Sequence, residues 1–228
     1  MLYNNKYFSP GDSYIKFPDH NEFALTIQTD PISSQASSAK KRKLTNDIQF
    51  ISSMFSFHIK GDVSIDLEWY VHEQQRYETD SCPDTDNIIK PILDALTGTR
   101  GFLIDDCQVQ SVSCRWIDID STVQSLRISI RSYSNHVTYK QDGVFFVQYD
   151  KCLCFPFWKT LNGNLLKTFA EHVHKQIAAR NMMIDAGRSY YSAKGFMPIQ
   201  RLFHKTRIKD FPVISYSDLV QANYFHPF

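Results

Sequence analysis

The alternation of apolar and polar residues around Trp69 constrains the fold more than any other part of this sequence. Ile65, Leu67, Trp69 and Val71 are separated by single polar, acidic or tyrosyl residues. Successive side chains of a β-strand point to opposite faces, so this spacing gives one apolar and one polar face. The pattern predicts a strand of a sheet that is covered on one side only.

Further strands and helices are expected on both sides of this strand. They are a first strand with Phe23, Leu25 and Ile27, a helix with Leu44, Ile48, Ile51 and Phe55 that ends near Gly61, a helix over about 87–97, a strand with Val112, Cys114 and Trp116, and a strand from Val123 to Tyr133 with Leu126, Ile128 and Ile130 facing inward. The order β-α-β-α-β-β predicts a mixed-sheet α/β (α+β) domain with its core at residues 22–133.

Residues 134–228 are expected to form a smaller module, with a hairpin over 143–155 and a helix that runs to about Asp185. The two parts differ in charge. Residues 1–133 hold 13 Lys and Arg against 18 Asp and Glu, whereas residues 134–228 hold 12 against 6. This split favours the second part as the phosphate-facing surface, and a chance asymmetry is the alternative.

The composition excludes several classes of protein. No apolar run approaches the roughly 20 residues that cross a bilayer, and the first residues lack a secretory pattern, so a soluble, cytoplasmic, DNA-associated protein is expected. The five cysteines have no framework spacing, which is typical of free thiols in a reducing compartment. His172 and His174 are two apart, which does not put two ligands on one helix face, so we expect them to be packed or solvated.

The strongest chemical signal is the group Asp84, Asp86, Lys90 and Asp106. On an extended segment Asp84 and Asp86 would point the same way, and Asp106 begins the next strand. Clustered carboxylates repel one another, and a hard divalent cation such as Mg²⁺, or Mn²⁺ in its place, relieves the repulsion. The alternative is ordinary helix chemistry, with Asp86 or Asn87 as a cap and Lys90 paired with Asp94 on the surface.

The segment from Asp84 to Gln108 closely resembles the signature of the RusA family of Holliday-junction resolvases. The matching parts are Asp-x-Asp-Asn-x-x-Lys, then Asp-Ala-Leu, then Asp-Asp-x-Gln, and the resemblance covers roughly half of the chain. It implies metal-binding acids at Asp84, Asp86 and Asp106 and a catalytic lysine at Lys90. It also implies a homodimer that uses Mg²⁺ to nick four-way DNA junctions during recombination or repair.

The chain departs from that family in its acidic first part and its long second part. The basic cluster formed by Lys40, Lys41, Arg42 and Lys43 could contact DNA phosphates, or it could be a solvated helix start. Asn87 is a further candidate for contact with DNA. Residues 134–228 could supply further DNA contacts or bind a protein partner. The competing functions are an inactive DNA-binding or assembly subunit and a nuclease that acts on another target, such as invading DNA.

The basic second part also contains interleaved aromatic residues, namely Tyr190, Tyr191, Phe196 and Phe203. Such rings can stack on nucleic-acid bases, or they can form the core of a small module. We expect most of them to be core.

Overall fold

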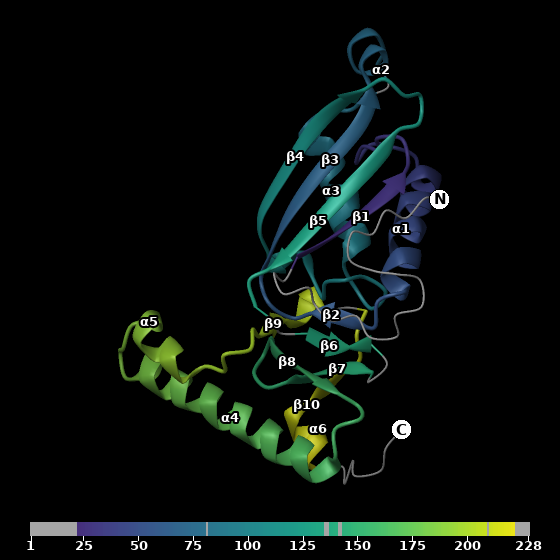
Figure 1. The fold of residues 1–228 in the computed structure, drawn as a ribbon. Coiled ribbons are helices and arrows are strands. Elements are labelled where there is room, and N and C mark those ends of the chain that lie inside the picture. Colours follow the sequence, from purple (N-terminus) through teal and green to yellow (C-terminus); the bar gives the residue numbers. More distant parts are fainter. Residues whose placement is uncertain (1–21, 81, 135–136, 141–142, 209, 222–228) are drawn as a thin grey trace. The chain divides into compact units, whose positions relative to one another are not determined.

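The computed structural model describes residues 22–80, 82–134, 137–140, 143–208 and 210–221. These residues form two compact units that divide between Val137 and Thr138 (Figure 1). The architecture is the predicted mixture of helices and mixed sheets. Within the described residues, no helix combines the length and apolar character that a membrane span requires.

The first unit contains a four-stranded sheet in the order β1-β5-β3-β4. Its strands are β1 (Glu22–Gln28), β5 (Ser125–Ser132), β3 (Val63–His72) and β4 (Val109–Ile119). Neighbours are antiparallel except β3 and β4, which run parallel. Parallel neighbours need a crossover connection, which here consists of α2 (Glu73–Glu78) and α3 (Thr85–Leu96).

One face of this sheet is covered by α1 (Ser38–Ser53) and α3 (Figure 1). The alternation around Trp69 is confirmed, because the four apolar residues of that pattern are buried, as are Leu126, Ile128 and Ile130 of β5. The other face is polar. There Glu68 lies between Arg115 and Arg127 and forms an ion pair with each, so part of the acidic charge of this unit is balanced within the sheet.

The region between β1 and β3 differs from the prediction. The helix ends at Ser53 rather than near Gly61, and it begins at Ser38, so the basic cluster lies inside it. Ser37 caps its start by accepting a hydrogen bond from the backbone N–H of Lys40. Phe55 lies beyond the helix but is buried, and the short strand β2 (Phe57–Ile59) that follows was not predicted. Three residues are too few for an alternation to stand out.

The second unit contains a sheet in the order β10-β7-β8-β9. Strands β7 (Val144–Gln148) and β8 (Leu153–Trp158) form the predicted hairpin. The remaining elements are β6 (Val137–Tyr139), at the division between the units, α4 (Gly163–Asp185), α5 (Tyr190–Ala193), η3 (Lys194–Phe196), β9 (Phe203–His204), η4 (Lys205–Arg207), β10 (Val213–Ser215) and α6 (Tyr216–Gln221).

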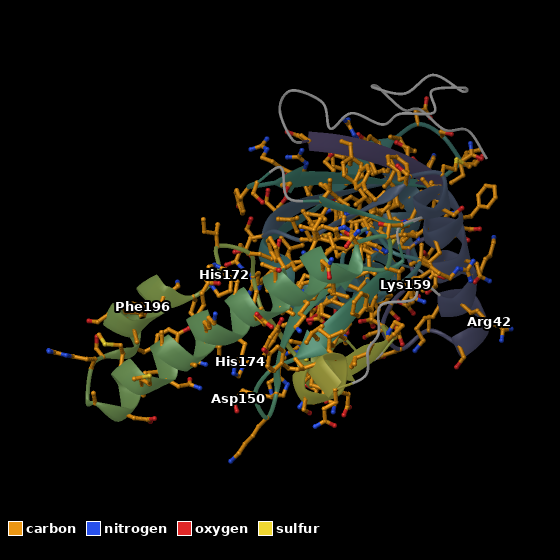
Figure 2. The ribbon with its side chains drawn as sticks, turned by 90° about the horizontal axis from the view of Figure 1, so that it is seen from below. Arg42, Asp150, Lys159, His172, His174 and Phe196 are labelled. Carbon is orange, nitrogen blue, oxygen red and sulfur yellow. The ribbon has the colours of Figure 1, made fainter. Side chains whose placement is uncertain are left out.

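Helix α4 ends at Asp185, where the sequence predicts. It buries Ala170, Val173 and Ile177 against the sheet, whereas Leu165 and Phe169 are exposed. His172 and His174 lie on different sides of the helix (Figure 2), as the spacing predicts. His174 stacks on Tyr216 with ring centroids 4.3 Å apart, and both histidines remain exposed to solvent.

Candidate active site

The first turn of α3 presents two of the predicted acidic residues. Asp84 is the N-cap and Asp86 lies in the first turn, and both are exposed. The expected extended Asp84–Asp86 pair is therefore wrong, because the helix already begins at Thr85. The expected cap at Asp86 or Asn87 is wrong for the same reason. The Asp84 side chain makes no capping hydrogen bond, which leaves its carboxylate available to a ligand.

A hydrogen bond to β4 fixes the position of this helix start. The indole Nε1 of Trp116 donates to Oγ1 of Thr85 over 3.2 Å, and Thr85 separates the two acids in sequence. The guanidinium of Arg76 lies 5.7 Å from the centroid of the Trp116 ring and forms a 2.9 Å ion pair with Asp118. Strand β4 therefore positions the acidic turn through a side chain that belongs to neither helix.

The loop after β1 is attached to the same turn through Asn87. The Ser34 hydroxyl donates to Oδ1 of Asn87 over 3.0 Å, and the Ser34 N–H donates to the Asn87 carbonyl over 2.7 Å. Nζ of Lys41 donates to the Ser34 carbonyl over 3.0 Å. Two of the predicted DNA contacts, Asn87 and Lys41, thus have a structural role in joining the loop, α1 and α3.

Lys90 lies one turn further along α3, between acidic neighbours. Its Nζ is 2.8 Å from Oδ1 of Asp94, and both side chains are largely exposed. The hydrogen bond to Asp94 raises the pKa of Lys90 above its ordinary value, and the charges of Asp94 and Asp106 act in the same direction. Lys90 is therefore a permanent cation at neutral pH, and Asp106 lies within its electrostatic reach.

Asp106 is held on a short 3-10 helix, η1 (Asp106–Gln108), directly before β4. The Gln108 side chain is fully buried and makes four hydrogen bonds. Its Oε1 accepts from the N–H groups of Ile104 and Asp105, and its Nε2 donates to the carbonyls of Ile59 and Gly61. The Asp105 carboxylate accepts from the Cys107 N–H and caps the turn. The two adjacent acids therefore differ in role, because Asp105 caps η1 and Asp106 is its first residue.

The structure brings Lys90, Asp94 and Asp106 into one electrostatic neighbourhood and places Asp84 and Asp86 at the start of the same helix. It does not bring the three predicted ligands together. Among the residues that the structure describes, no three His, Cys, Asp or Glu side chains are arranged to hold a metal ion. The three aspartates nonetheless fit Mg²⁺ in their chemistry, because all of their donor atoms are carboxylate oxygens. Asp84 and Asp86 are also exposed.

The other cations of the basic cluster remain accessible. Lys40, Arg42 and Lys43 are exposed on α1, and Arg42 projects from the helix in Figure 2. Within the described ranges these three residues form no ion pair with a carboxylate. Their charge is thus available to a phosphate.

Sequence reasoning missed the supporting residues of the site. Gln108 could have been found, because Asp105-x-x-Gln108 has the spacing of a capping box. The roles of Trp116 and Ser34 carry no local signal, since their partners are 31 and 53 residues away. The five cysteines are present as thiols, as expected.

Carboxylates beside a lysine are groups that can hold a divalent ion near a phosphate. Residues 32–131 match the family described as Endodeoxyribonuclease RusA. The resemblance seen in the sequence is therefore confirmed over these residues, which are similar to that family. A comparison with curated proteins gave no match.

Proposed function

We propose that the first unit is a Mg²⁺-dependent endodeoxyribonuclease that cuts branched DNA. The observation that carries this proposal is the position of Lys90, which lies one turn after Asp86 on α3 and within electrostatic reach of Asp106. All four residues belong to the segment that matches the family.

In this proposal Asp84, Asp86 and Asp106 hold the metal ion. When bound, Mg²⁺ (or Mn²⁺) supplies charge stabilisation at phosphorus and lowers the pKa of a bound water. The protein's own contribution is to position the acids. Trp116 holds the helix start through its hydrogen bond, and the buried Gln108 holds η1.

Lys90 acts as a fixed positive charge and not as a base. Its raised pKa keeps it protonated, so it can hold a phosphate oxygen but cannot accept a proton at neutral pH. The first N–H groups of α3 point toward the same region and add partial positive charge. Together they favour a transition state in which negative charge grows on the phosphoryl oxygens.

The preferred substrate in this proposal is a four-way junction, which a homodimer with two equivalent sites would nick on two strands. Lys40, Arg42 and Lys43 would contact backbone phosphates. The competing functions make different predictions. An inactive DNA-binding or assembly subunit would bind without cutting, and a nuclease with another target would prefer a flap, a single strand or a plain duplex.

The test is a single-turnover cleavage assay with Mg²⁺ on those four DNA structures. We expect the wild-type protein to cut the junction fastest, and Asp86→Asn and Asp106→Asn to lose cleavage while they still bind DNA without metal. Asp105→Asn is the matched control. Asparagine also caps helices well, so this variant should cut within a few-fold of wild type. Equal losses in Asp105→Asn and Asp106→Asn, or wild-type cutting by Asp106→Asn, would refute the site.

A further inference from the structure

The end of α4, together with α5 and η3, forms an arm (residues 178–196) that extends beyond the core of the second unit. Ile177 is the last buried residue of α4, although the helix continues to Asp185. Figure 1 shows this part of α4 running away from the sheet of its own unit toward α5, and Figure 2 places Phe196 at the far end. The described residues of α4 beyond Ile177 add no fully buried side chain to that core.

The backbone of the arm is nevertheless well defined. Gly187 has a φ of +77°, its N–H donates to the Ile184 carbonyl, and the Arg188 N–H donates to the Met183 carbonyl. These two bonds form the turn that ends a helix at a glycine and reverses the chain. Ser189 then caps α5, and Ala193 is buried as α5 and η3 pack against α4.

This packing leaves the aromatic rings outside. Ala193 is the buried residue of α5. Tyr190, Tyr191 and Phe196 are 55%, 83% and 45% exposed, so the expectation that most of these rings are core is wrong. Phe203 alone of the predicted set is buried. Tyr190 and Tyr191 meet edge to face, with centroids 5.7 Å apart at 79°.

The charges around these rings are mainly positive. From residue 163 to residue 196 the chain has five Lys and Arg against two Asp and Glu. Lys175, Arg188 and Lys194 are exposed and form no ion pair within the part of the chain that the structure describes. The Nε of Arg180 is buried without a hydrogen-bond partner among the described residues. The arm therefore combines exposed rings with unpaired cations.

We infer that the arm binds single-stranded nucleic acid, with Tyr190, Tyr191 and Phe196 stacking on bases and Arg188 and Lys194 contacting phosphates. Exposed rings beside unpaired cations form the usual surface for unpaired strands, because every base has a face on which a ring can stack. A duplex fits less well, since its bases already stack on one another. An acidic protein would use the cations but not the planar faces of the rings. This binding does not depend on the proposed nuclease activity.

The test uses the full-length protein and a labelled oligothymidylate of about 16 nucleotides, without divalent metal, with fluorescence anisotropy as the readout. We expect Tyr190→Ala/Tyr191→Ala to weaken binding about tenfold or more. Tyr191→Leu, which keeps an apolar side chain but no ring, should weaken it about fivefold. Ile199→Ala removes a neighbouring side chain that is 95% exposed but not aromatic, and it should leave affinity unchanged.

The charges have a separate readout. Arg188→Gln/Lys194→Gln should reduce the slope of log affinity against log salt by about 1.4, because each phosphate contact in a single strand contributes about 0.7. Wild-type affinity in the double tyrosine variant would overturn the inference. So would an equal loss of duplex binding in that variant, or competition by polyglutamate that matches oligothymidylate charge for charge.

Discussion

The turns that carry the acids in the first unit have their side chains held in place, whereas the arm of the second unit has only its backbone held in place. In η1 and the start of α3, side chains are held by other side chains, as in Gln108 with its four hydrogen bonds and Asn87 with Ser34. In the arm, backbone hydrogen bonds around Gly187 and one buried alanine define the shape. Arg188 and Lys194 form no ion pair among the described residues there, and the aromatic rings stay exposed.

This difference matches two kinds of task. Chemistry at a phosphodiester needs groups held within fractions of an ångström, and supporting hydrogen bonds provide that precision. Contacts that tolerate any base sequence need an accessible surface whose side chains can adapt. The cost of the second arrangement is the side-chain entropy lost when the ligand binds, which limits its affinity.

The largest effect is expected where the support is buried. Gln108→Ala would leave two carbonyls and two N–H groups without the partner that they have now, and should lower the free energy of unfolding by about 3–5 kcal/mol. Urea unfolding measures this change. Gln110→Ala, at an exposed position on β4, is the control and should change stability little. If both variants lowered the free energy of unfolding by similar amounts, Gln108 would have no special role in stability.

A smaller effect is expected at the helix start. Trp116→Phe keeps a ring but loses the hydrogen bond to Thr85, and should cost about 1 kcal/mol of stability and slow single-turnover cleavage about tenfold. Thr85→Val removes the same bond from the other side. If this bond positions the acids, the double variant should behave like either single one. Strictly additive losses would show that the two residues act separately.

A still smaller effect is expected at Asp94. The raised pKa of Lys90 means that its protonated form is favoured in the folded chain. The contribution of this pair to the stability of the fold is complete at neutral pH. It is lost only as the pH rises above 10.5, the ordinary pKa of a lysine, and through the raised pKa of Lys90. Asp94→Asn should therefore change the cleavage rate near pH 7 by less than about threefold. In a rate profile against pH, the decline at alkaline pH should move to lower pH. A loss of activity already at neutral pH would show that Asp94 has a direct role.

The smallest effect on stability is expected in the arm. Tyr191→Ala removes a ring that is 83% exposed and should change the free energy of unfolding by less than about 0.5 kcal/mol. The same urea titration that is used for Gln108 measures it. A loss comparable to that of Gln108→Ala would mean that the ring stabilises the fold, and the contrast between the two regions would disappear.

The sheet of the first unit could be predicted because its signal is local. Strands β1, β3 and β5 alternate regularly, and each buries the expected side chains. The start of α3 could not be predicted as securely, because Asp-x-Asp fits both an extended segment and a capped helix. The hydrogen bond from Trp116 to Thr85 favours the helix, and that partner lies 31 residues away.

The prediction that most of these aromatic rings are core was wrong for a different reason. Composition predicts that aromatic residues fill the core of a small module, and Phe203 does so. Tyr190 and Tyr191 do not, because the buried residue of α5 is Ala193. Which residue of a short helix faces its neighbour depends on how the chain reverses at Gly187, and no periodicity can be read from four residues.

Strand β1 shows that a sequence signature and a folding unit can have different boundaries. The segment that matches the nuclease family begins at residue 32, after β1 has ended. Yet β1 pairs with β5 from Glu22 to Gln28, and the Phe23 ring lies 5.0 Å from that of Phe102. A fragment cut at the signature would expose β5 as a new edge strand and leave the aromatic core open, which invites aggregation. The segment that matches the family is therefore shorter than the segment that must fold to support its residues.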